Sequence, residues 1–129
     1  MKTDLDPAVD ELASRFIAAI EAADTAGIAA CCTDDVVIWH NFDDREVELG
    51  EVVPLLASLA DRVPDLHYAD IRRCATSDGY VQQHVLRGTA PSGELQLPAC
   101  LVVEVQAGCI TRIDEYLDRG SLDVLKRPH

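Results

Sequence analysis

Basic residues and aromatic residues are both scarce in this chain of 129 residues. Lys and Arg number 11 against 23 acidic residues, the formal net charge is −12, and aromatics make up 5%. Affinity for nucleic acids comes largely from Lys and Arg, and an acidic chain is repelled by phosphate backbones and anionic lipid surfaces. The sequence therefore predicts neither a nucleic-acid partner nor a membrane partner. With few aromatics, we expect a core of Val, Ile, Leu and Ala.

Signals for membranes, disulfides and metals are missing as well. No apolar run is long enough for a membrane span, and residues 1–11 lack the apolar stretch of a signal peptide. The five cysteines have no Cys-x-x-Cys spacing, which is best explained by free thiols in a reducing cytoplasm. The four histidines have no His-x-x-x-His spacing. We therefore expect a cytoplasmic protein without a metal site or an organic cofactor.

Helix signals are concentrated in the first half of the chain. Asp6 can cap a helix that starts at Pro7, after which apolar residues recur at helical spacing. Pro54 lies close enough to the start of a later helix to be tolerated there. The patterns predict helices over 7–23, 25–33 and 50–63, with strands over 36–41 and 45–49.

Strand signals dominate the second half. Four apolar segments follow Pro64 and are separated by the short turns SDG, APSG and AG. Helices that come early and strands that come late favour an α+β fold, a curved antiparallel sheet with helices on its concave side. We expect a single domain over residues 1–129. The predicted strands are 66–74, 80–89, 94–106 and 109–118.

The last strand carries an ionisable residue among apolar ones. Residues two apart share a face of a strand, so Glu115 lies on the same face as Ile113 and Leu117. Burial of a carboxylate raises its pKa and makes it a candidate general acid or base. The alternative is a Glu at the strand edge, paired with an arginine such as Arg112 or Arg119.

The first strand ends in the polar cluster Trp39, His40 and Asn41. Trp39 and Asn41 share one face and His40 the other, and both faces are apolar enough to be buried. The cluster either delivers polar groups into the mouth of a cavity or runs out into a solvated turn. Trp39 can also be plain core, and Asn41 can be turning the chain.

His84 lies in the middle of a predicted strand, on the same face as Gln82. A histidine in such a place is more often structural than catalytic. A concave sheet can nevertheless point His84, Glu115 and Asn41 at one space. A hydrophobic pocket with a few converging polar groups is typical of small-molecule sites.

The chain resembles the nuclear transport factor 2-like superfamily in the order of its elements and in three motifs. These motifs are DDVVIWHN, the triplet RGT at 87–89 and the pattern G-x-I-x-x-x-x-x-Y-x-D over 108–118. SnoaL-like proteins, ketosteroid isomerases and limonene-epoxide hydrolases are the nearest groups. This resemblance implies a cone-shaped α+β barrel with an apolar pocket between sheet and helices. It also implies a homodimer formed through the sheet, with Arg112, Asp114 and Tyr116 at the contact.

The resemblance carries over to individual positions with several departures. The Tyr-x-Asn pair and the last-strand Asp of the epoxide hydrolases match Trp39, Asn41 and Glu115. Their Arg-x-Asp pair falls on Gln82 and His84. The position of the catalytic base in the ketosteroid isomerases matches His40 of this chain. Their helix tyrosine has no counterpart here, because the first helix offers Phe16 and no Tyr.

These observations predict a protein that binds a hydrophobic small molecule of terpenoid, steroid or polyketide type. Its predicted chemistry is isomerisation, cyclisation or water addition by acid–base catalysis. A non-catalytic binding or dimerisation module on the same fold is the alternative. We expect the catalytic residues to be Glu115 as base, His84 as acid or partner, and Asn41 as orienting group. The expected pocket residues are Trp39, His40, Gln82, Phe16 and Ile113.

Overall fold

The computed structural model describes residues 5–126 and contains every helix and strand that the sequence predicts. Boundaries differ by a few residues, the largest difference being a first strand that begins at Cys32. A short 3-10 helix after the last strand, η1, is an addition. The elements are α1 (Pro7–Glu21), α2 (Thr25–Ala30), β1 (Cys32–His40), β2 (Arg45–Glu48), α3 (Leu49–Arg62), β3 (His67–Ala75), β4 (Gly79–Ala90), β5 (Gly93–Gln106), β6 (Cys109–Leu117) and η1 (Arg119–Leu125).

Local sequence explains where these elements begin and turn. The Asp6 side chain accepts a hydrogen bond from the backbone N–H of Ala8, and Pro7 occupies the first turn of α1. The β5–β6 hairpin turns through Ala107 and Gly108, which both have positive φ angles of 51° and 80°. Two such residues form the type I′ turn that matches the twist of a hairpin.

The six strands form one sheet in the order β2-β1-β6-β5-β4-β3. Four of the pairings are antiparallel, but β1 and β6 run parallel, which corrects the prediction of a purely antiparallel sheet. A parallel pair needs a long crossover, and here the whole chain between β1 and β6 supplies it. The first and last strands thereby lie side by side at the middle of the sheet.

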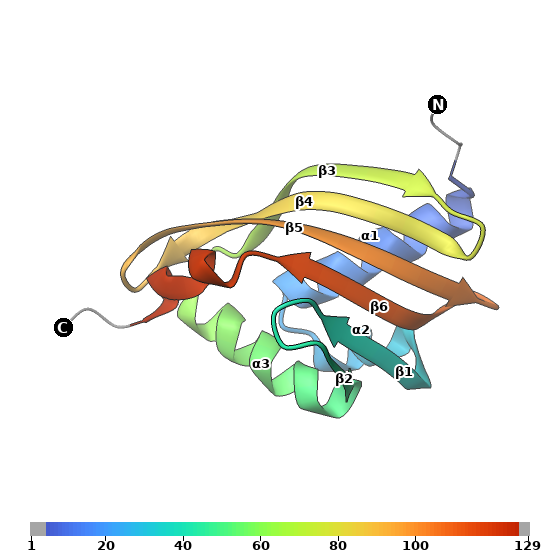
Figure 1. Cartoon of the computed structure of the whole chain (residues 1–129), viewed down its shortest axis with the longest axis horizontal. Coiled ribbons are helices and arrows are strands. Elements are labelled where there is room, and N and C mark those ends of the chain that lie inside the picture. The colour runs from blue at the N-terminus through green and yellow to red at the C-terminus, as the bar shows by residue number, and fades with distance from the viewer. Residues whose placement is uncertain (1–4, 127–129) are drawn as a thin grey trace.

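The sheet is curved and does not close, and Figure 1 shows α1 behind its strands and α3 crossing below β6 and β1. The predicted α+β class and the placement of the helices in the first half are therefore confirmed. No helix among residues 5–126 is long and apolar enough to cross a membrane.

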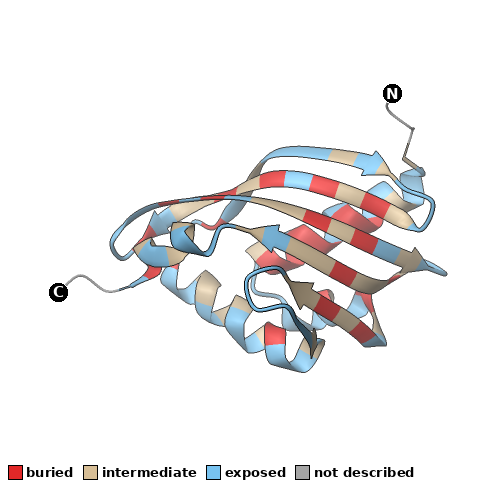
Figure 2. Ribbon diagram, in the orientation of Figure 1, coloured by how far each residue is buried: buried red, intermediate tan, exposed pale blue. Residues whose placement is uncertain are grey.

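Two apolar clusters fill the space between helices and sheet. The first cluster joins α1 and α2 to the middle of the sheet, and the second joins the end of α3 to η1 and the far end of β4 and β5. Figure 2 shows the buried residues of the strands alternating with more exposed ones, as expected when one face of a sheet is covered. Buried members of the first cluster include Leu12, Phe16, Ile38, Tyr80, Leu101 and Ile113, and those of the second include Val63, Leu86, Leu95, Leu97 and Leu125.

Candidate functional site

Strand register decides which side chains share the covered face of the sheet, here called the inner face. His40 of β1 lies opposite Glu115 of β6, Glu115 lies opposite Leu101 of β5, and Leu101 lies opposite Gln82 of β4. Paired residues project to the same side, and Leu101 belongs to the first apolar cluster. His40, Glu115 and Gln82 therefore point toward the helices.

The polar side chains of the inner face form a row between the two clusters, here called the inner polar belt. On β4, Tyr80 belongs to the first cluster and Leu86 to the second, with Gln82 and His84 between them. Gln82 and His84 are the only two polar residues among the described ones that are classed as buried. The inner polar belt consists of Arg73, Gln82, His84, Glu115 and His40.

The closest ionisable pair in the inner polar belt is His40 with Glu115. His40 Nε2 lies 3.0 Å from Glu115 Oε1, and the side chains are 16% and 26% exposed. The hydrogen bond to Glu115 raises the pKa of His40, burial lowers it, and the charges of Glu115 and Asp43 raise it again. The pair thus favours a protonated His40 beside a carboxylate that solvent can still reach.

This geometry differs from the expected environment of Glu115. The residue is neither enclosed by Ile113 and Leu117 alone nor paired with an arginine, because Arg112 pairs with Glu46 and Asp114. Its partner is His40, and not His84 as expected. The sequence did not show this because His40 and Glu115 come together only through the parallel pairing of β1 with β6.

His84 lies deeper than Glu115 and has a different set of neighbours. Its Nδ1 is 2.9 Å from Gln82 Nε2, and its ring meets the Tyr68 ring edge-on at 4.7 Å between centroids. Burial lowers the pKa of His84, the charge of Glu115 raises it, and Arg73 lowers it. Burial followed by the charge of Glu115 also raises the pKa of Tyr68. His84, Tyr68 and Glu115 therefore share one electrostatic neighbourhood.

Trp39 and Asn41 lie away from this neighbourhood. Trp39 lies opposite Asp114 in the register and so projects from the uncovered outer face. There its ring meets Tyr116 edge-on at 5.2 Å, and its Nε1 donates to Asp44 Oδ1 at 2.8 Å. The Asn41 side chain accepts a hydrogen bond from the backbone N–H of Leu117 at 3.0 Å, which extends the β1–β6 pairing.

Two expected pocket residues are packed in the core. Phe16 is 5% exposed and Ile113 is 4% exposed, and both belong to the first cluster. They support the inner polar belt from below and leave little surface for a ligand. Of the expected pocket residues, His40 and Gln82 are the two whose polar groups lie in the belt.

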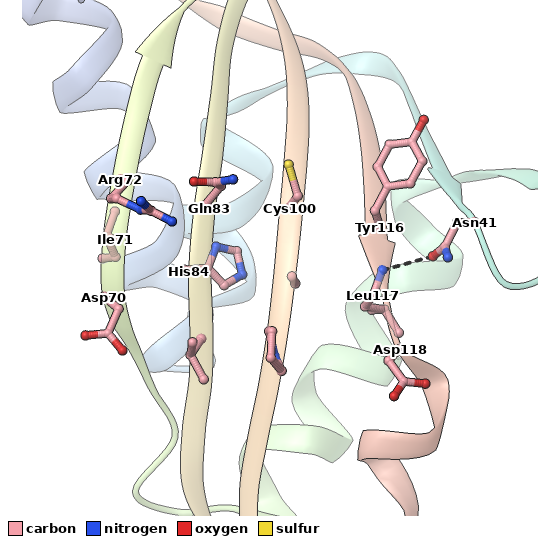
Figure 3. A pocket seen from close by; sticks show the side chains of 13 residues that line it. Asn41, Asp70, Ile71, Arg72, Gln83, His84, Cys100, Tyr116, Leu117 and Asp118 are labelled. Atoms are coloured by element: carbon pink, nitrogen blue, oxygen red, sulfur yellow. Dashed lines mark hydrogen bonds between the residues drawn. The ribbon is translucent and has the colours of Figure 1, made fainter. Parts of the chain in front are cut away.

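The largest of the five described pockets lies on the outer face, whereas the prediction placed the pocket between sheet and helices. It is a shallow groove of about 910 Å³, and Figure 3 shows Arg72, Gln83, Cys100 and Tyr116 along it on four neighbouring strands. The remaining lining residues are Asn41, Asp70, Ile71, His84, Val85, Pro98, Ala99, Leu117 and Asp118.

Sequence reasoning missed Arg73 and Tyr68 of β3. The Arg73 guanidinium donates to Gln82, Asp10 and Ser14, each at 2.8 Å. Strand alternation on β3 does not identify these residues, because the register shifts between Ala69 and Arg72. A buried Gln beside a mid-strand His was the available signal that a charged partner lies nearby.

Residues 5–126 contain no group of three or more His, Cys, Asp or Glu side chains placed to hold a metal ion. The polar groups of the inner polar belt instead suit proton transfer and hydrogen bonding. Glu115 can accept a proton, and a histidine can donate or accept one near neutral pH.

Comparison with known proteins gives one family match and many structural matches. The model of the SnoaL-like domain matches residues 13–113. No curated protein sequence matches the chain.

Three solved structures illustrate the structural likeness. A protein with a ketosteroid isomerase-like fold from Catenulispora acidiphila DSM 44928, solved with trimethylamine, has a TM-score of 0.75 and 13% identity, covering 92% of this chain and 94% of that one. A proposed SnoaL-like polyketide cyclase from Shewanella denitrificans OS-217 has a TM-score of 0.73 and 16% identity, covering 91% and 95%. An LEH-like epoxide hydrolase from M. tuberculosis has a TM-score of 0.70 and 22% identity, covering 88% and 85%.

Proposed function

Because the chain belongs to the SnoaL-like domain family, we propose that it is an acid–base enzyme acting on a hydrophobic small molecule at the inner polar belt. The observation that carries this proposal is the contact of 3.0 Å between His40 and Glu115 on the inner face. A carboxylate held by a protonated histidine and still open to solvent is a suitable proton acceptor.

Glu115 is proposed as the general base. Within residues 5–126, its carboxylate is held by His40 through Oε1, and no hydrogen bond to Oε2 occurs. Oε2 is therefore available to take a proton from a carbon next to a carbonyl, or from a water molecule. His40 keeps the carboxylate oriented and lowers its tendency to swing into solvent.

His84 is proposed as the group that binds the substrate oxygen. β4 and β6 are separated by β5 alone, so His84 and Glu115 are carried on strands about 10 Å apart, two strand spacings. Ala99, the residue opposite His84 on β5, is small. In this proposal, a substrate of several carbons lies between the two side chains, with its oxygen at His84 and its acidic proton at Glu115.

Apolar side chains around the belt support a hydrophobic ligand. Leu56 and Leu59 of α3 and Tyr68 of β3 are partly buried and pack against the two clusters. Isomerisation or cyclisation by proton transfer next to a carbonyl fits this set of groups, and so does addition of water. That the protein resides in the cytoplasm remains a prediction from the sequence.

The experiment measures exchange of protons for deuterium next to the carbonyl of apolar ketones by NMR, and opening of aryl epoxides to diols. We expect the protein to accelerate at least one reaction, and Glu115→Gln to lower that rate about 10²–10⁴-fold, the usual contribution of a general base. Asp114→Asn is the matched control, because this carboxylate lies next in sequence on the outer face. Equal rates for the wild type, Glu115→Gln and Asp114→Asn would refute the assignment.

The non-catalytic alternative is favoured by one observation, the position of the largest described pocket on the outer face. A protein of that kind would catalyse none of the test reactions, and a probe bound in the outer groove would shift the NMR signals of His84, which lines that groove, but not those of His40. We also propose a homodimer through the outer face. Its exposed apolar residues Tyr116 and Ile71, 45% and 39% exposed, support this proposal.

A further inference from the structure

A chain of hydrogen bonds runs from α1 to His84 through Arg73 and Gln82. The Arg73 side chain is 11% exposed and is anchored on α1 by Asp10 Oδ1 at 2.8 Å and Ser14 Oγ at 2.8 Å. Its Nε donates to Gln82 Oε1 at 2.8 Å. Gln82 Nε2 then lies 2.9 Å from His84 Nδ1.

This chain determines where the proton of His84 resides. A guanidinium can only donate hydrogen bonds, so the Gln82 atom facing Arg73 must be the carbonyl oxygen. The NH2 group of Gln82 therefore faces His84, and an amide NH2 can only donate. His84 Nδ1 must accept this bond, which leaves the single ring proton of a neutral imidazole on Nε2.

Burial makes the arrangement rigid. Gln82 is 0% exposed and His84 is 5% exposed, so neither side chain can exchange its partner for bulk water at low cost. A protonated imidazole would turn the Nδ1 hydrogen toward the Gln82 NH2 group, donor against donor. The charged groups that act on His84 are Glu115, which favours the cation, and Arg73, which opposes it.

The Nε2 side of the His84 ring remains open. Within residues 5–126, Tyr80 Oη is the buried side-chain nitrogen or oxygen atom that has no hydrogen-bond partner. His84 Nε2 also makes no hydrogen bond to these residues, but it is not among the fully buried atoms without a partner. This atom is therefore accessible, and among the five described pockets His84 lines the groove on the outer face.

We propose that Arg73 and Gln82 are positioning residues that hold His84 as the neutral Nε2–H tautomer, aimed as a hydrogen-bond donor at a substrate oxygen. This proposal rests on the proposed function and names the substrate class more narrowly. The ligand must present a hydrogen-bond acceptor, such as the carbonyl oxygen of a ketone or ester or the oxygen of an epoxide. An ammonium group, which has donors and no lone pair, would meet a second donor at the same place.

The first experiment records the long-range ¹H–¹⁵N spectrum of the histidine rings in the full chain. The wild type is expected to show an unprotonated Nδ1 and a protonated Nε2 at His84. Gln82→Glu keeps the size of the side chain and its contact to Arg73, but replaces the donor that faces His84 with an acceptor. This variant is expected to move the proton to Nδ1 or to produce the imidazolium.

The matched control is Gln83→Glu, which makes the same change one residue later, on the outer face. It should leave the His84 spectrum unchanged. A wild-type spectrum with the proton on Nδ1 overturns the proposal without any variant, so failure of Gln82→Glu to fold does not protect it. An unchanged tautomer in a folded Gln82→Glu protein also overturns it.

The second readout is kinetic and uses whichever ketone or epoxide the protein turns over. If Gln82→Glu moves the proton to Nδ1, the loss of the Nε2–H donor should lower kcat about 10²–10³-fold, the range for removal of one oxyanion donor, with little change in KM. Glu115→Gln should lower turnover about 10²–10⁴-fold and keep the wild-type tautomer. A wild-type protein that has the expected His84 tautomer but no turnover refutes the proposed function alone. A Gln82→Glu protein that has the shifted tautomer but full turnover refutes the positioning role alone.

Discussion

The two faces of the sheet are built from the same strands and carry opposite kinds of polar contact. On the inner face, Glu115 and His40 meet between two apolar clusters, with side chains 26% and 16% exposed. On the outer face, Arg112 pairs with Glu46 and Asp114 near solvent, with its own side chain 31% exposed. Polar groups that are partly desolvated interact more strongly than screened ones. Our proposals therefore assign chemistry to the inner face and association to the outer face.

The largest expected effect of this difference is on stability. Leu101 is 4% exposed and lies on the inner face of β5, whereas Val102 projects from the outer face of the same strand. Leu101→Ala should lower the free energy of unfolding by about 2–5 kcal/mol, because it leaves a cavity in the first cluster. Val102→Ala should cost about 1 kcal/mol or less. Urea unfolding followed by circular dichroism measures both, and equal losses would show that the two faces are equally packed.

A smaller effect is expected from the pH dependence of the His40–Glu115 pair. The hydrogen bond to Glu115 raises the pKa of His40 above its ordinary value of 6.5. A raised histidine pKa stabilises the fold below pH 6.5, and this contribution is lost as the pH rises through the folded value. The wild type should therefore exceed His40→Asn in stability more at pH about 6 than at pH about 9.

Thermal unfolding of both proteins across this range measures the difference. Glu115→Gln is the control, because it removes the main cause of the raised pKa and should show a similarly weakened pH dependence. The titration of His84 keeps its Glu115 contribution in the wild type and in His40→Asn, whereas Glu115→Gln also removes a charge that raises the pKa of His84. A stability difference that grows toward high pH would contradict the assignment of His40 as the protonated partner.

The smallest effect on the stability of the single chain is expected at Tyr116 on the outer face. Tyr116→Glu should change the free energy of unfolding by about 1 kcal/mol, because the side chain is 45% exposed and loses one edge-on ring contact with Trp39. In a symmetric dimer through this face, however, the new charge of each copy would lie near that of the other. We expect the mass in solution to fall from two chains to one, measured by light scattering after gel filtration.

Leu55→Glu is the matched control for this test, because Leu55 is a large apolar residue, 66% exposed, on α3. It introduces the same charge away from the outer face and should leave the dimer intact. A wild-type protein that is already monomeric would show that the outer face does not form a dimer. The comparison between the faces would then rest on the chemistry of the inner face.

Much of the fold could be predicted because its signals are local. The cap at Asp6, the helical spacing of α1 and the short turns between the last strands each act within a few residues. The alternation that put Glu115 on the face of Ile113 was also correct, because Ile113 lies opposite Val103 and Glu115 opposite Leu101, which are both buried residues of the inner face. η1 was missed, since the segment Arg119–Leu125 has neither a strand pattern nor the length of a helix signal.

The site was only partly predictable, and β1 shows why. Val36 and Ile38 are apolar, but so are Val37 and Trp39, so the sequence does not say which face is covered. The structure covers the face of Ile38 and His40, which brings His40 to Glu115 and sends Trp39 outward. The Arg73–Gln82–His84 contacts likewise depend on the register between β3 and β4 and on the position of α1.

The sequence by itself determined the elements, their order, the acidic character of the chain, and the strand face that carries Glu115. These properties follow from the period of side chains along a helix or strand, which is set by backbone geometry. Only the tertiary structure decided the partner of Glu115, the partner of His84 and the face that Trp39 occupies. Each of these depends on segments far apart in the chain, and the packing of the two clusters against the curved sheet is what brings them together.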